Sequence, residues 1–149
     1  MRVRLPLSPQ PKYIFMNEIN KQLAKDFTEY VFRVLKANPG MQLKQAFAIV
    51  AKMSAPRIYI KSGEYARRYI NAAIKGKPIQ FASPYRQAMY DELCGRYINS
   101  FSGRPPRYFD EDTFERIAKQ PAPSWYREYH TLVYLFYAYQ HEQLKHKPL

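Results

Sequence analysis

Residues 17–40 read NEINKQLAKDFTEYVFRVLKANPG, and this stretch decides the class of the fold. Its apolar residues recur three and four positions apart, the spacing of one face of an α-helix. These residues are Ile19, Leu23, Phe27, Tyr30, Val31, Val34 and Leu35. Asn17 is placed to cap the start of the helix, and Pro39-Gly40 ends it. The stretch therefore predicts an amphipathic helix from Glu18 to about Ala37.

Five further helices are expected along the rest of the chain, because apolar residues recur at helical spacing between caps and helix breakers. The expected starts are Gln42, Ser62, Ser83-Pro84, Asp110-Glu111-Asp112 and Ser124. The expected ends of the first four are about Met53, Gly76, about Ser100 and the residue before Pro121. The last helix is expected to present Trp125, Tyr129, Leu132, Val133 and Phe136 on one face.

One short segment, Arg57-Ile58-Tyr59-Ile60-Lys61, alternates between polar and apolar residues. An extended backbone would direct its two isoleucines to the core and Arg57, Tyr59 and Lys61 to the opposite side. Nothing else alternates for long enough to build a sheet. The sequence therefore predicts an all-α fold, a compact bundle of about six helices with at most one short extended segment near residues 57–61.

The length of 149 residues suits one domain, which we place at residues 17–149. Residues 1–16 carry prolines at positions 6, 9 and 11, and we interpret them as a flexible basic N-terminal arm or a translated leader. Met16 is the alternative start. We expect a chain that begins at Met16 to keep its stability within roughly 1 kcal/mol.

The sequence favours the cytoplasm. The first residues lack the apolar segment and cleavage site of a signal peptide, and the lone Cys94 leaves no intrachain disulfide. The densest apolar run is residues 132–139, well short of the 18 to 20 residues that span a bilayer. We therefore expect no membrane association.

Motifs for catalysis and metal binding are missing from the sequence. His141 and His146 are five residues apart, which places them on different sides of a helix, and His130 lies eleven residues before His141. Cys94 falls inside an apolar stripe, and the acidic residues from Asp110 to Glu115 suit a helix start. No glycine-rich phosphate loop occurs. We expect no enzymatic activity, no metal and no cofactor.

The whole chain has a formal net charge of +12, and the positive charge is concentrated in one part of it. Residues 38–109 hold 12 lysines and arginines against three acids, a net charge of +9. The last forty residues hold five against six, a net charge of −1. A basic surface without matching acids is typical of proteins that bind nucleic acid.

Tyrosines are interleaved with these cations between residues 57 and 77, and their rings can stack on bases while the cations contact phosphates. The candidate nucleic-acid-binding residues are Arg57, Tyr59, Lys61, Tyr65, Arg67, Arg68, Asn71, Lys75 and Lys77. The sequence thus predicts a small basic helical protein that binds DNA or RNA mainly through phosphates, with little base specificity. A helix-turn-helix is disfavoured, because the connection of about eight residues before the third helix exceeds the usual turn.

Two other interpretations stay open. The cations can form a solvated face whose long stems cover apolar surface. Alternatively, the protein is an adaptor or an oligomerising subunit that binds another protein or itself through an aromatic surface on the last helix. The rings of that surface are Tyr126, Tyr134, Phe136, Tyr137 and Tyr139.

Overall fold

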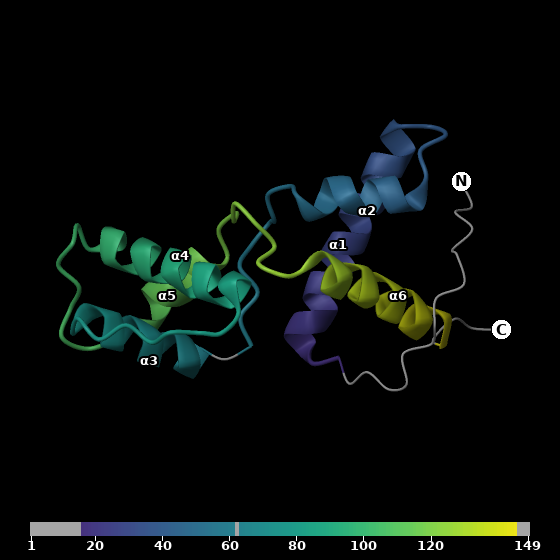
Figure 1. Cartoon of the computed structure of the whole chain (residues 1–149). Helices are drawn as coiled ribbons and strands as arrows, with labels where there is room; N and C mark the ends of the chain where they lie inside the picture. The colour runs from purple at the N-terminus through teal and green to yellow at the C-terminus, as the bar shows by residue number, and fades with distance from the viewer. Residues whose placement is uncertain (1–15, 62, 146–149) are drawn as a thin grey trace. The chain divides into compact units, whose positions relative to one another are not determined.

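A computed structural model describes residues 16–61 and 63–145, and the regular structure of these residues is helical (Figure 1). The helices are α1 (Glu18–Ala37), α2 (Leu43–Ala51), α3 (Gly63–Ile74), α4 (Pro84–Ser100), α5 (Glu111–Ala118) and α6 (Tyr129–Lys145). Within the described ranges the backbone forms no strand, only one isolated antiparallel bridge between Ala55 and Ala122. The predicted all-α class is confirmed. The expected cap Ser62 and residues 1–15 lie outside the described residues.

The chain divides into two compact units, and each is described by itself. The terminal unit consists of residues 1–53 together with 128–149, and it contains α1, α2 and α6. The middle unit consists of residues 54–127 and contains α3, α4 and α5. The single domain expected over residues 17–149 stays a prediction. None of the described helices is long and apolar enough to cross a membrane.

The terminal unit packs α1 against both α2 and α6, and α2 also contacts α6. Asn17 caps α1 as expected, because its side-chain oxygen accepts a hydrogen bond of 2.8 Å from the backbone N–H of Asn20. The apolar stripe of α1 is buried, and Phe27 stacks on Phe47 of α2. The Phe47 ring in turn meets Phe136 of α6 at a centroid distance of 4.8 Å. These rings form the centre of the unit.

The start of the last helix differs from the sequence prediction. Ser124 does not cap α6, which begins only at Tyr129. The hydroxyl of Ser124 instead accepts a hydrogen bond of 2.9 Å from the N–H of Tyr126, whose φ of 55° is incompatible with a helix. Trp125 therefore does not share a helical face with Tyr129, and it packs in the middle unit.

In the middle unit α4 packs against both α3 and α5. The chain returns between α3 and α4 along the irregular residues 75–83, so the two helices run in the same direction and their first turns lie at the same end (Figure 1). Ser83 and Pro84 start α4 as predicted, with the Ser83 hydroxyl accepting from the N–H of Arg86 at 3.3 Å. This parallel arrangement brings the N-terminal turns of α3 and α4 together.

The segment before α3 corrects the expected alternation. Tyr59, expected to face outward, is only 1% exposed and stacks on Trp125 with centroids 6.0 Å apart. Its neighbour Ile58 is buried too, and the N–H of Ile58 donates to the carbonyl of Ala118 at the end of α5. Two consecutive residues are buried because Trp125 packs against the Tyr59 side chain while the backbone at Ile58 binds α5.

Candidate nucleic-acid interface

Eight of the nine predicted binding residues keep solvent exposure, and Tyr59 is the exception. Because its ring is buried against Trp125, Tyr59 cannot stack on a base, and its assignment as a nucleic-acid-binding residue is wrong. Arg57 and Lys61 lie in the segment that precedes α3, and Lys77 follows its end. Of the other five predicted residues, Tyr65, Arg67, Arg68 and Asn71 lie on α3, and Lys75 directly follows its last residue.

The exposed side of α3 carries most of the predicted residues. The helix buries Ala66, Tyr69 and Ile70, and at about 100° per residue the opposite side carries Arg67, Arg68 and Asn71, with Lys75 directly after the helix end. Tyr65 lies at the flank of this side, toward α4, and 46% of the residue is exposed. Glu64 is the one acid on the helix, and it pairs with Arg68 at 3.4 Å.

Arg86, in the first turn of α4, extends this surface. Its guanidinium carbon lies 4.8 Å from the ring centroid of Phe81, 5.3 Å from that of Tyr65 and 5.9 Å from that of Tyr90. Among the described residues it has no carboxylate within ion-pair distance. The guanidinium is thus held by rings while its N–H groups make no ion pair in this part of the chain.

Arg86 is not among the nine predicted binding residues, although its spacing in the sequence indicates a place on this surface. Arg86 lies four residues before Tyr90 and seven before Leu93, so it heads the buried stripe of the helix that Ser83-Pro84 announces. A cation at the exposed end of an aromatic stripe is expected to pack against the rings below it. Phe81 had no such signal, because it lies in an irregular segment.

The rings beneath Arg86 are fixed by a polar network. The Tyr69 hydroxyl donates to Asp91 and accepts from the Gln87 amide at 2.9 Å, and Gln87 also accepts from the backbone N–H of Phe81 at 2.8 Å. Phe81 stacks on Tyr90 with centroids 4.9 Å apart. Burial and the neighbouring Asp91 raise the pKa of Tyr69 well above its usual range, so its hydroxyl stays a neutral donor.

Two other arginines of the middle unit serve its internal structure. Arg96 pairs with Glu92 at 3.0 Å and donates to the carbonyls of Ile117 and Pro121, which lie at and beyond the end of α5. Arg127 donates to the Tyr59 carbonyl at 2.9 Å, and burial lowers the pKa of its guanidinium. Arg96 was counted in the net charge of +9, so the charge presented to a ligand is smaller than the sequence indicates.

Four of the seven acidic residues of the middle unit lie on α5 or directly before it. Asp110 precedes the helix, and Glu111 and Asp112 occupy its first turn, where the helix dipole favours negative charge. The Thr113 hydroxyl donates to Asp110 at 2.7 Å. This arrangement fits the expected helix start. Helix α3, by contrast, carries a single acid, Glu64.

The aromatic surface expected on the last helix is smaller than its sequence suggested. Phe136 is fully buried, Tyr137 and Tyr139 are half-buried, and Tyr126 precedes α6. Tyr134 remains, with 42% of the residue exposed. Association with another protein through this helix stays a prediction.

Other chemistry-bearing residues are dispersed. Within residues 16–61 and 63–145, no group of three or more His, Cys, Asp or Glu side chains could hold a metal ion. Cys94 is buried, and burial raises the pKa of its thiol. No family model matches the chain, and the searches of curated proteins and of solved structures found no significant match.

Proposed function

We propose that this protein binds nucleic acid through the α3–α4 surface, which comprises Tyr65, Arg67, Arg68, Asn71, Lys75 and Arg86. The main support for the proposal is the environment of the Arg86 guanidinium. Its guanidinium rests on three rings, and no carboxylate among the described residues neutralises it. The cations on the outer side of α3 continue from this point.

Charge and preorganisation both support phosphate binding at this surface. Lysines and arginines that contact phosphates release condensed counterions, which is the main source of sequence-independent affinity. The Glu64–Arg68 pair is exposed, with both side chains about two-thirds accessible, so a phosphate competes for Arg68 at little cost. Packing against rings restricts Arg86 before binding, which lowers the entropy that binding must spend. Contacts of this kind give little base specificity.

The proposal includes the cellular setting. We expect binding in the cytoplasm, because one buried cysteine suits a reducing compartment. DNA and RNA both present the phosphates that this surface would contact. We propose no catalytic step, and the protein acts as a binding module.

The test is a binding titration with a labelled oligonucleotide at several salt concentrations. The logarithm of the affinity should fall linearly with the logarithm of the salt concentration. The double charge reversal Arg67→Glu and Arg68→Glu should lower the affinity at least tenfold, since two phosphate contacts become repulsive. Circular dichroism of the variant checks that α3 still forms beside Glu64.

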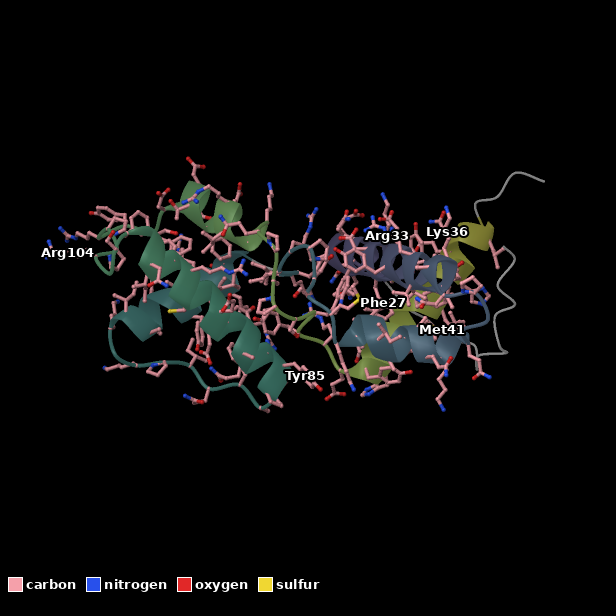
Figure 2. All side chains as sticks on the ribbon, turned by 90° about the horizontal axis from the view of Figure 1, so that it is seen from above. Phe27, Arg33, Lys36, Met41, Tyr85 and Arg104 are labelled. Atoms are coloured by element: carbon pink, nitrogen blue, oxygen red, sulfur yellow. The ribbon has the colours of Figure 1, made fainter. Side chains whose placement is uncertain are left out.

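The matched control reverses Arg33 and Lys36 on α1. These two exposed cations of the terminal unit project from the helix in Figure 2, and they lie three residues apart. Reversing them changes the net charge by the same amount as the α3 variant. An affinity loss equal to that of the α3 variant would mean that overall charge, and not the α3–α4 surface, binds the oligonucleotide.

A further inference from the structure

We infer that the α3–α4 surface takes single-stranded nucleic acid, with an unpaired base stacked against Tyr65 and Arg86. The inference rests on the proposed function, and it adds the class of nucleic acid. It starts from the kind of surface that lies beside the α3 cations, which is aromatic as well as charged.

Tyr65 provides a flat, accessible ring at the edge of this surface. Nearly half of the residue is exposed, although its neighbour Ala66 and the residues Tyr69 and Ile70 one turn later are buried. The Arg86 guanidinium, a second flat group, lies 5.3 Å from the ring centroid. Tyrosine rings and guanidinium planes both stack on bases, and stacking tolerates any base because every base has a π-face.

Arg86 is fixed from below, which suits it to a stacking role. Phe81 and Tyr90 lie on its protein side. The backbone N–H of Phe81 donates to Gln87, and the Tyr90 ring packs against Phe81 and Tyr69. A guanidinium that is held this way can stack with one face and donate its N–H groups to a phosphate in its plane. Arg68 lies one turn after Tyr65, within reach of the next phosphate.

Duplex nucleic acid would not offer a base face to the Tyr65 ring. In a duplex each base face is covered by its neighbours, so a protein reaches only the phosphates and the edges of the bases in the grooves. A single strand exposes its base faces and its phosphates together. An exposed ring beside a cation with no carboxylate partner among the described residues matches that combination.

The experiment compares three labelled probes against the full chain at low salt. They are an oligothymidylate of about 12 nucleotides, within the range that single-strand sites cover, an abasic strand of equal phosphate count, and a duplex of equal length. We expect the oligothymidylate to bind roughly tenfold more tightly than the abasic strand. Tyr65→Ala should remove this difference, whereas Tyr65→Phe should keep it.

Two further variants separate stacking from folding and from charge. Tyr134→Ala removes a tyrosine of similar exposure from α6, and its three affinities should equal those of the parent chain. Arg86→Lys keeps the charge and loses the flat face, so it should weaken oligothymidylate binding more than abasic binding. Thermal melts confirm that each variant folds.

The outcomes distinguish this inference from the proposed function. Equal affinities for the oligothymidylate and the abasic strand, or tightest binding of the duplex, would overturn the single-strand inference and leave phosphate binding in place. Failure of all three probes to bind at low salt would overturn both.

Discussion

The middle unit and the terminal unit each pack three helices around aromatic rings, but they treat polar groups differently. In the terminal unit the central rings meet one another, as Phe27, Phe47 and Phe136 do. In the middle unit the buried Tyr69 hydroxyl hydrogen-bonds to Asp91 and Gln87, and the Arg86 guanidinium packs on the neighbouring Phe81 ring. The middle unit holds 13 lysines and arginines against seven acids, and the full terminal unit, residues 1–53 and 128–149, holds 11 against five, so both units carry a net charge of +6. The two units therefore differ in where their cations lie and not in their net charge.

The cations of the middle unit also fall into two groups that the net charge does not separate. Arg96 and Arg127 bind backbone carbonyls inside the unit, so they hold its segments together. Arg67 on α3 and Lys75 directly after it are exposed. Arg104 lies in the loop after α4, where Figure 2 shows it pointing away from the helices. A cation that binds groups inside its own unit, as Arg96 and Arg127 do, does not contribute to a binding surface, although it adds to the net charge.

The largest expected effect comes from the rings that close the middle unit. Trp125→Ala should lower the free energy of unfolding by about 3–5 kcal/mol, because it removes a fully buried ring that stacks on Tyr59. Urea unfolding measures the loss, and amide hydrogen exchange locates it. Loss of protection should concentrate in residues 54–127. The equivalent variant in the terminal unit, Phe136→Ala, should instead expose amides of α1, α2 and α6. The same exchange pattern for both variants would show that the two units do not unfold separately.

A smaller effect is expected from the polar network. Tyr69→Phe should cost about 2 kcal/mol at neutral pH, because it removes a hydrogen bond to the Asp91 carboxylate. The folded protein raises the pKa of Tyr69 above the unfolded value of about 10, so its stabilising effect is complete below pH 10 and is lost as the pH rises toward the folded pKa. The difference between the parent chain and the variant should therefore shrink above pH 10. A difference that grows with pH would contradict this assignment.

The smallest effects are expected at the helix caps, one in each unit. Asn17→Ala should cost about 1 kcal/mol, since the side chain of Asn17 binds the N–H of Asn20 at 2.8 Å. Ser83→Ala should cost about half as much, because its bond to the N–H of Arg86 is longer, at 3.3 Å. Chemical denaturation of the two variants measures both values. A larger loss for Ser83→Ala would show that this cap also positions Arg86.

Local signals in the sequence predicted most of the helices. Asn17 with Pro39-Gly40 bounded α1, Ser83-Pro84 began α4, and the acids at Asp110 began α5, because caps and breakers act on neighbouring backbone. The same signals failed at Ser124, whose hydroxyl binds the N–H two residues later and forms a turn. A serine before an apolar run is compatible with both outcomes.

The candidate site was predicted in part, and the missing part depends on contacts between distant residues. The outer side of α3 follows from helical periodicity, so Arg67, Arg68 and Lys75 could be found from the sequence. The burial of Tyr59 could not, because it depends on Trp125, which lies 66 residues later. The ring contacts of Arg86 likewise combine α3, the segment before α4 and α4 itself.

The order of the two units along the chain has a consequence for folding during synthesis. The middle unit is contiguous, so the ribosome adds all of its residues to the chain before those of α6. The terminal unit cannot complete its core until α6 is synthesised, because α1 and α2 pack against Phe136 of that helix. At about 5–20 residues per second, the 92 residues from 54 to 145 take roughly 5–20 s to synthesise. During that time α1 and α2, with Phe27 and Phe47, lack their contact with α6, so the terminal unit can complete its core only at the end of synthesis.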